Sequence, residues 1–337
     1  MNRKNERRSF IKGATGVLAS LGLGASAFVS EGRHQAESVA LKEPFKSSNP
    51  LILFDNFHSG NRRSYSTKAR IAAAEHAGFD GFEFVYMEPK TDWWKSTMDL
   101  IPNSKLSMWG LHWTSRAVVD KNASKINSDI ERIEELVEEC SKTKIEYISM
   151  SLQTSGELVG STIYESGSAK AEDRHWERAY KIVSAFDKAC EKFNIRGSLY
   201  PHTHWICDTP QSVEKILEGA NAKHLGPSFC SHHWYANKNS VELDEVLKSP
   251  IMKRLNYVVL TNGKFVGNQF PAVRFDEGEI DMAWVLAKLM SFGYKGAISS
   301  QGWAIGGDPY IACKRFVDTI NGLKKRFQNQ PDLWPLN

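Results

Sequence analysis

From residue 50 onward, short apolar runs alternate with longer segments in which apolar residues recur every three or four positions. The runs have the length of strands, and the longer segments have the period of amphipathic helices. In chain order the pairs are LILFDNF with TKARIAAAEHAGF, GFEFVY with a loop and helix around 91–102, LSMWGLHW with INSDIERIEELVEECSK, IEYISMSL with DRHWERAYKIVSAFDKACEKF, IRGSLYPH with TPQSVEKILEGA, HLGPSFCSH with NSVELDEVLKS, LNYVVLTNG with DMAWVLAKLMSFG, and GAISSQGW with PYIACKRFVDTINGLKKRF.

This alternation predicts the fold class. Strands that alternate with helices indicate a parallel sheet, whose strands are buried on both faces and therefore apolar along their length. Eight such units in roughly 280 residues predict an α/β protein with a single-domain (β/α)8 TIM barrel. A doubly wound open sheet is the alternative. No G-x-G-x-x-G turn follows the first strand, which argues against a dinucleotide-binding version of that sheet.

The N-terminal segment has a different pattern. Basic residues precede an apolar stretch of small residues from Gly13 to Leu23, and Ala25-Ser26-Ala27 has the form of a cleavage site. The sequence RRSFIK at 7–12 closely resembles the twin-arginine export signal of bacteria. An amphipathic helix or a membrane anchor is the alternative. The stretch is shorter than the roughly 20 apolar residues of a spanning helix.

These features divide the chain and place it outside the cytoplasm. We expect a periplasmic or otherwise exported protein without a membrane span in the mature chain, although a tethered form stays open if the signal is not cleaved. The expected parts are a signal peptide over 1–27, a polar linker over 28–49, and the barrel over 50–330.

The charge of the mature chain argues against nucleic-acid binding. The whole chain holds 43 Lys and Arg and 39 Asp and Glu, of which five basic residues and one acidic residue lie in 1–27. The remainder is therefore neutral, with 38 of each sign, so its charge favours no polyanionic partner. The five cysteines are an odd number without close pairs, which indicates free thiols rather than a disulfide framework, with one disulfide left open.

Polar residues at the strand ends locate the expected site, because reactive groups of such barrels come from the carboxyl ends of the strands. Aromatic residues recur among them and suit the apolar faces of sugars. The polar and aromatic candidates at or just past these ends are Asp55, Asn56, His58, Glu83, Tyr86, His112, Trp113, Gln153, Tyr200, His202, His204, Trp205, Cys230, His232, His233, Trp234, Asn262, Lys264, Gln301 and Trp303.

Several motifs in this order resemble the xylose isomerase-like TIM barrels, also called sugar phosphate isomerase/epimerases. They are AEHAGFDGFEF at the second strand, FCSHHW at the sixth, DEGEID before the seventh helix and GYKGAISSQGW at the eighth, and the resemblance covers 50–327. It implies a barrel that often holds a divalent metal and acts on sugars, ketoses or polyols. The implied chemistry is proton transfer at the carbon beside a carbonyl.

The usual metal ligands of that family are replaced in this chain. By motif alignment, a Glu, an Asp, a His and a Glu are replaced by Tyr200, Cys230, Thr261 or Asn262, and Gln301. The two carboxylates that double as acid and base in the family are among them. A cage of His112, His202 and His233 is the alternative metal site, since imidazole suits Zn²⁺, Fe²⁺ or Mn²⁺ when three donors converge. Without a metal, histidines would act as acid and base.

The remaining expectations concern single side chains. If the fifth strand continues through Thr203, His202 and His204 point into the mouth with Tyr200. Of the adjacent pair after the sixth strand, His233 is expected in the site and His232 behind it.

Glu83, in an otherwise apolar strand, is predicted to be a general base or a ligand. The alternative is a salt bridge to Arg70 or Lys68. The candidates for binding substrate are His112, Tyr200, His204, Asn262, Gln301 and Trp303, and those for catalysis are Glu83, His202 and His233.

Three functions fit these observations. The first is an exported isomerase/epimerase-like enzyme that transfers a proton beside the carbonyl of a sugar or keto-sugar. The second is a 3-keto-glycoside lyase, in which loss of the C2 proton allows β-elimination of the C1 substituent. The third is a non-catalytic sugar-binding barrel. The expected partner is a small carbohydrate, and a homo-oligomer stays open. An endonuclease is disfavoured by the neutral charge and the incomplete carboxylate set.

Overall fold

The computed structural model describes residues 49–56, 65–85, 87–119, 123–154, 156–237, 241–303 and 305–331, which belong to one compact unit, Leu41–Asn337. The expected signal peptide and almost all of the expected linker lie outside these residues. The same is true of His58 and Tyr86. In the described part of the chain, no helix combines the length and the apolar character needed to cross a bilayer.

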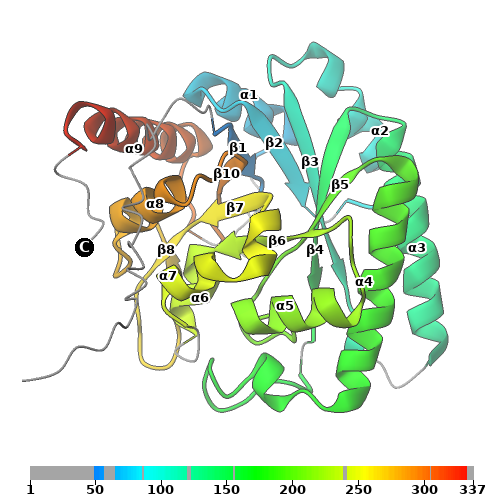
Figure 1. Cartoon of the computed structure of the whole chain (residues 1–337). Coiled ribbons are helices and arrows are strands. Elements are labelled where there is room, and N and C mark those ends of the chain that lie inside the picture. Colours follow the sequence, from blue (N-terminus) through cyan, green and yellow to red (C-terminus); the bar gives the residue numbers. More distant parts are fainter. Residues whose placement is uncertain are drawn as a thin grey trace, which may run out of the picture. The chain divides into compact units, whose positions relative to one another are not determined.

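Eight parallel strands close into a barrel in the order β1-β10-β7-β6-β5-β4-β3-β2 (Figure 1). The predicted TIM barrel is confirmed, and the open-sheet alternative is wrong. The barrel strands are β1 (Leu51–Phe54), β2 (Gly81–Val85), β3 (Met108–Ser115), β4 (Ile145–Leu152), β5 (Arg196–Leu199), β6 (Gly226–Cys230), β7 (Tyr257–Leu260) and β10 (Ala297–Ser300). Two short strands, β8 (Asn262–Gly263) and β9 (Ala272–Val273), pair antiparallel outside the barrel.

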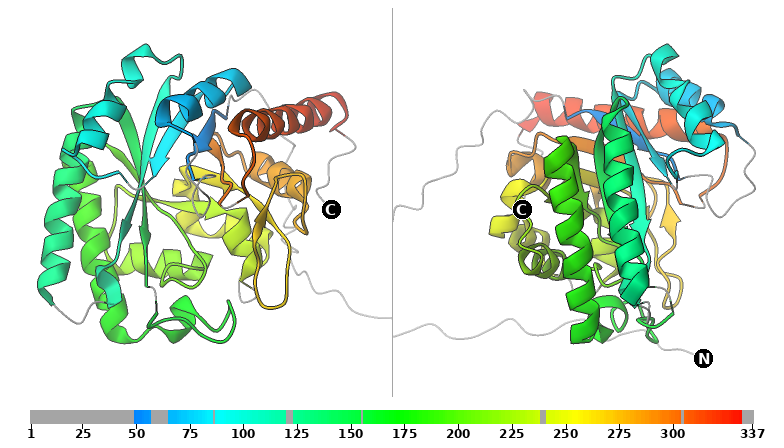
Figure 2. Two further views of the ribbon diagram at one scale, coloured as in Figure 1. Left: turned by 180° about the vertical axis from the view of Figure 1, so that it is seen from behind. Right: turned by 90° about the vertical axis from the view of Figure 1, so that its right-hand side faces the viewer.

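Helices cover the outside of the barrel, and α1 packs beside α9 and α3 beside α4 (Figure 2). Several of them begin with a side-chain cap. The Ser66 hydroxyl accepts from the Ala69 N–H at α1, and the Asp308 carboxylate accepts from the Ile311 N–H at α9. The helices are α1 (Thr67–Ala77), α2 (Asp92–Met98), α3 (Ala123–Ser141), α4 (Asp173–Phe193), α5 (Pro210–Gly219), α6 (Ser231–Ala236), α7 (Leu243–Lys248), α8 (Met282–Ser291) and α9 (Pro309–Asn329).

Two apolar clusters form the core. The larger lies between the strands and the helices, as the continuous apolar runs of the strands require. The smaller fills the barrel interior with side chains that alternate with those of the larger cluster. Its members are Ile52, Phe54, Val85, Tyr147, Tyr200, Cys230, Tyr257, Val259 and Ala297. All five cysteines are buried free thiols.

The structure corrects two local expectations. Strand β5 ends at Leu199, so the chain from Tyr200 to His204 is a loop and not an extended strand. A short helix, α6, begins at Ser231 directly after β6, so His232 and His233 lie in a helical turn. Both differences arise at the carboxyl ends of strands, where loop conformation replaces the strand period.

Candidate active site

A cavity of about 350 Å³ lies at the carboxyl ends of the barrel strands, where the fold was expected to place its site. Its walls come from β1, β3, β4, the loop after β5, helix α6, the β8–β9 segment and the end of β10. We call it the histidine cavity. The residues that line it are Phe54, Asn56, His112, Gln153, Tyr200, His202, Thr203, Trp205, His232, His233, Phe270, Pro271, Ala272, Gln301 and Trp303.

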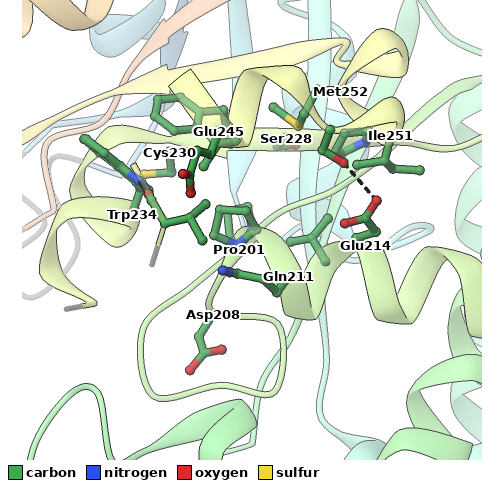
Figure 3. Close-up of a pocket in the computed structure, with 17 residues that line it drawn as sticks. Pro201, Asp208, Gln211, Glu214, Ser228, Cys230, Trp234, Glu245, Ile251 and Met252 are labelled. Atoms are coloured by element: carbon green, nitrogen blue, oxygen red, sulfur yellow. Dashed lines mark hydrogen bonds between the residues drawn. The ribbon is translucent and has the colours of Figure 1, made fainter. Parts of the chain in front are cut away.

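A second cavity, of about 220 Å³, lies between α5, β6 and α7 (Figure 3). Its wall is mostly apolar, with Pro201, Trp234 and Met252 among its residues. The Ser249 hydroxyl donates to the Glu214 carboxylate at 2.8 Å. No histidine lines this cavity in the described part of the chain. The candidate acid/base histidines therefore belong to the histidine cavity.

His202 lies in the cavity wall with one ring nitrogen fixed. Its Nδ1–H donates to the Thr203 carbonyl at 2.7 Å, which leaves the lone pair on Nε2. Its ring stacks on Trp205 with centroids 3.8 Å apart and lies 4.3 Å from the ring of His233. Burial lowers the pKa of His202 to about 4, so the ring is neutral at pH 7.

His204 does not accompany His202 into the cavity. Its backbone φ is +67°, a left-handed conformation that turns the side chain out of the strand-like alternation. His204 is half-buried and does not line the histidine cavity. The expected role of His204 in substrate binding is therefore not supported by its position, because β5 ends before it.

His233 presents a free nitrogen to the cavity. His232 Nε2–H donates to the Phe270 carbonyl at 2.7 Å, so Nδ1 of His232 carries a lone pair. That atom lies 3.3 Å from His233 Nδ1. His233 Nδ1 also accepts a hydrogen bond of 3.4 Å from the Thr203 N–H, and Thr203 Oγ1 lies at the same distance from it. Nε2 of His233 is buried without a hydrogen-bond partner, and burial lowers the pKa of the ring well below its usual value.

His232 also lines the cavity, contrary to the expectation that only one of the two histidines does. That expectation assumed an extended segment, in which neighbouring side chains point to opposite faces. In the turn of α6 the two rings lie 5.0 Å apart at 89°, and His232 joins His233 to the β8–β9 segment.

Glu83 lies beneath the cavity rather than in its wall. It is fully buried on β2, and Ser149 Oγ–H donates to Oε1 at 2.5 Å. The Tyr257 hydroxyl donates to Oε2. Glu83 was expected to act as a general base or ligand, and it does not line the cavity. The alternative salt bridge is also wrong, because Arg70 pairs with Asp55 at 2.8 Å. Burial raises the pKa of Glu83 to about 7, against the lowering effect of its hydroxyl partners.

His112 joins this buried network to the cavity. Its Nδ1 lies 2.8 Å from Ser149 Oγ, and its Nε2 lies 3.1 Å from Ser151 Oγ. Its ring meets Tyr200 edge-on, with centroids 5.2 Å apart. Burial, together with the nearby His202, lowers the pKa of His112 to about 3. Ser149 and Ser151 were missed as site residues, although their alternation with apolar residues in IEYISMSL indicated polar groups facing into the barrel.

The four positions that replace the family's metal ligands do not fit a metal. The Tyr200 hydroxyl lies 3.2 Å from Gln301 Oε1 and 3.3 Å from Cys230 Sγ, so neutral groups satisfy one another there. Thr261 Oγ1–H donates to the Gln301 carbonyl. Of the four replacements, only the thiol of Cys230 belongs to a residue type that commonly holds Zn²⁺, and one such group is fewer than a zinc site uses.

The expected cage of His112, His202 and His233 is also not formed. Within the described residues, no group of three His, Cys, Asp or Glu side chains is arranged to hold a metal ion. Both ring nitrogens of His112 lie within hydrogen-bond distance of serine hydroxyls, so neither is free as a ligand. Only the Nε2 atoms of His202 and His233 remain, and two donors are fewer than a protein zinc site uses.

The last two candidates for binding substrate differ in outcome. Asn262 is buried, and its amide donates to the carbonyls of Phe275 and Ile280, while its oxygen accepts from the N–H groups of Gly263 and Ile280. It therefore holds the chain together and does not line the cavity, contrary to expectation. Trp303 lines the cavity and is 44% exposed, and its role in binding substrate stays a prediction.

The chain belongs to the family described as xylose isomerase-like TIM barrel, which matches residues 71–315. It is similar in structure to L-ribulose 3-epimerase, at 12% identity and a TM-score of 0.67, with 86% of this chain and 99% of that chain covered. It is also similar to 3-keto-D-glucoside 4-epimerase from E. coli, at 13% identity and a TM-score of 0.60, with 82% and 100% covered.

A third similar structure is the IolI protein with a zinc atom, at 14% identity and a TM-score of 0.61, with 83% of this chain and 98% of that chain covered. Identities this low show a shared fold and leave the reaction of this chain to its own residues. Comparison with curated proteins gave no match.

Proposed function

We propose that the protein is a carbohydrate enzyme that transfers a proton at the carbon beside the carbonyl of a sugar or keto-sugar. The observation that carries the proposal is the buried, unpartnered Nε2 of His233 in the cavity wall, beside the free Nε2 of His202. A neutral imidazole with an unpartnered nitrogen is suited to exchange a proton with a bound substrate. The family and its epimerase relatives support the substrate class.

The groups around these imidazoles suit an uncharged sugar. Gln301 and Asn56 line the wall with amide groups that pair with hydroxyls. Trp205 and Trp303 offer aromatic faces for the apolar face of a pyranose. We propose that Gln301 and Tyr200 bind the sugar and that His202 and His233 exchange the proton.

Solvent deuterium exchange tests this proposal. The protein is incubated in D₂O with neutral ketohexoses and with a 3-keto-glucoside, and deuterium entering the carbon beside the carbonyl is followed by NMR. His233→Gln is expected to lower the exchange rate by about 10²–10⁴-fold, the usual contribution of an acid/base group. The matched control is His204→Asn, which changes a histidine outside the cavity, in the loop after β5, and keeps a residue that tolerates positive φ.

Two results would count against the proposal. Micromolar binding of these sugars without any exchange would indicate a sugar-binding barrel. Equal loss of exchange in both variants would show that a general disturbance of the structure, rather than loss of the His233 ring, is responsible.

A 3-keto-glycoside lyase is the second candidate. It is favoured by the replacement of the family's three carboxylate ligands by Tyr200, Cys230 and Gln301, which hydrogen-bond to one another. Epimerisation needs proton donors on both faces of one carbon, whereas β-elimination needs one base and an acid for the leaving group. An aryl 3-keto-glucoside tests it. Release of the phenol with formation of an unsaturated keto-sugar is expected, and exchange without release would leave the isomerase/epimerase-like reaction.

We also propose export, on the strength of the basic, apolar and A-x-A segments within 1–27. Fusing residues 1–49 to a reporter that is active only outside the cytoplasm tests it. Reporter activity that is lost in the double variant Arg7→Lys, Arg8→Lys is expected for the twin-arginine route. Activity that persists in that variant would contradict this route.

A further inference from the structure

Glu83 is a carboxyl group in the barrel interior without a cation beside it. In the described part of the chain it takes part in no salt bridge, and Ser149 and Tyr257 supply its hydrogen bonds. The titratable groups that face it are the phenols of Tyr147 on β4 and Tyr257 on β7, whose pKa values burial raises well above the usual value. A buried carboxyl group without a counter-charge is costly, which calls for a reason beyond packing.

A continuous hydrogen-bonded path leads from this carboxyl group to the cavity. Ser149 Oγ lies 2.5 Å from Glu83 Oε1 and 2.8 Å from His112 Nδ1. The His112 ring lines the cavity, and its Nε2, on the opposite side of the ring from Ser149, lies 3.1 Å from Ser151 Oγ. Three residues on three neighbouring strands, β2, β3 and β4, thus form one path.

The protons along the path can be arranged in two ways, and the His112 imidazole is neutral in both. When Glu83 is ionised, Ser149 O–H donates to it and accepts from His112 Nδ1–H, so Nε2 of His112 carries a lone pair. When Glu83 is protonated, it donates to Ser149, which donates to Nδ1, so Nε2 carries the proton. When a proton binds at Nε2, the proton already on Nδ1 passes to Ser149 and the serine proton passes to Glu83, so one proton is gained in total and it resides on Glu83.

We propose that Glu83, Ser149 and His112 form a proton relay in which a proton taken up at His112 Nε2, beside the Ser151 hydroxyl, comes to rest on Glu83. The inference rests on the proposed proton-transfer function and adds a second acid/base group to the site. Tyr200 separates this group from the first, because its ring contacts both His112 and His233. Glu83 and Ser149 are positioning residues, since neither lines the cavity.

The surroundings of His112 and Glu83 favour transfer of the proton from the imidazole to the carboxyl group. Burial disfavours the imidazolium form of His112, whose pKa it lowers to about 3. The pKa of Glu83 is raised to about 7 by the same cause, so this carboxyl group can hold or release a proton near neutral pH. The relay lets His112 act while its ring stays neutral throughout.

NMR of ¹⁵N-histidine-labelled full chain tests the relay without any substrate. The His112 signals are expected to change from the Nε2–H tautomer to the Nδ1–H tautomer as pH rises through about 7, with no imidazolium. Glu83→Gln is expected to hold one tautomer over the whole range. A His112 tautomer that does not change with pH in the unaltered protein would overturn the relay, and so would the same change in Glu83→Gln.

Kinetics on a keto-sugar that exchanges give the second test. Glu83→Gln and Ser149→Ala are each expected to lower kcat for exchange by about 10²-fold or more and to remove the rate change near pH 7, with little effect on KM. The double variant should be no slower than either single variant, because each substitution already interrupts the same proton path. Ser228→Ala removes a buried barrel hydroxyl that pairs with Ser198 outside the path, and should keep the profile.

The outcomes separate the two proposals. A pH-dependent tautomer in a protein that exchanges no keto-sugar would contradict the proposed function and keep the relay. Exchange that depends on His233 but keeps its pH profile in Glu83→Gln would contradict the relay and keep the function.

Discussion

At the residue scale, burial decides the chemical state of the site. The imidazoles of His112, His202 and His233 are neutral because burial disfavours their charged forms. Glu83 is shifted in the opposite direction by the same cause, because its charged form is the ionised one. The site therefore joins neutral bases to a carboxyl group that can be protonated near pH 7.

This difference predicts how stability depends on pH. The pKa of Glu83 is about 7 in the fold and 4.5 as its ordinary value, so the folded state binds the extra proton between these limits. Stability from this group is full below pH 4.5 and falls by about 3 kcal/mol as pH rises to 7. The buried histidines act with the opposite sign, since their lowered pKa values make stability rise with pH.

The comparison of Glu83→Gln with the unaltered protein isolates the carboxyl group. Urea unfolding is measured from pH 4.5 to 8. The free energy of unfolding of the variant, relative to that of the unaltered protein, is expected to rise by about 3 kcal/mol between pH 4.5 and pH 7. Glu146→Gln removes an exposed carboxylate of β4 and should give a flat difference. If the stability difference for Glu83→Gln is also independent of pH, the pKa of Glu83 is not raised in the fold.

At the element scale, the segment from β8 to α8 is held to the barrel by Asn262. The Asn262 side chain makes four hydrogen bonds to the backbone of this segment, which also supplies Phe270 to the cavity wall. Its amide group therefore holds the backbone of this segment together. The residue type alone would have suited substrate binding equally well.

Asn262→Ala is expected to lower the free energy of unfolding by about 3 kcal/mol, because it leaves buried backbone carbonyl and N–H groups unsatisfied. Hydrogen exchange at the Ile280 amide should become faster. The matched control is Asn103→Ala, whose amide makes one exposed contact and whose loss should change stability by no more than about 0.5 kcal/mol. If the two substitutions lowered the free energy of unfolding equally, this structural role of Asn262 would be contradicted.

At the scale of the whole molecule, the barrel closes around a tightly filled interior. Gly110 on β3 faces the ring of Tyr147, and a Cβ at this position would lie 2.1 Å from Tyr147 Cζ. The Tyr147 ring in turn packs against Tyr257 across the barrel, with centroids 5.2 Å apart. Glycine at position 110 therefore makes room for the aromatic groups around Glu83.

Gly110→Ala is expected to lower the melting temperature and the free energy of unfolding by about 1–3 kcal/mol, the usual cost of overpacking a core. Gly322→Ala is the matched substitution, because Gly322 lies on the exposed side of α9 with open space around it. It should stabilise the protein by up to about 1 kcal/mol. A neutral Gly110→Ala in thermal and urea unfolding would contradict the packing described.

The sequence by itself determined the barrel and the position of its site. Strand and helix periods are local properties, so the eight units could be found from neighbouring residues. Because the carboxyl ends of parallel strands meet at one end of a barrel, His112, Tyr200, His202, His233 and Gln301 could be placed together.

Only the tertiary structure decided what each of these side chains does. The direction of a side chain past the end of a strand depends on loop dihedral angles, as the positive φ of His204 and the helical turn at His232 show. The partners of Glu83 and Asn262 come from other strands and loops, and no local period reports such long-range contacts. The same residue types could have formed a metal cage or a row of sugar ligands, and packing instead joined Glu83 to His112 through Ser149.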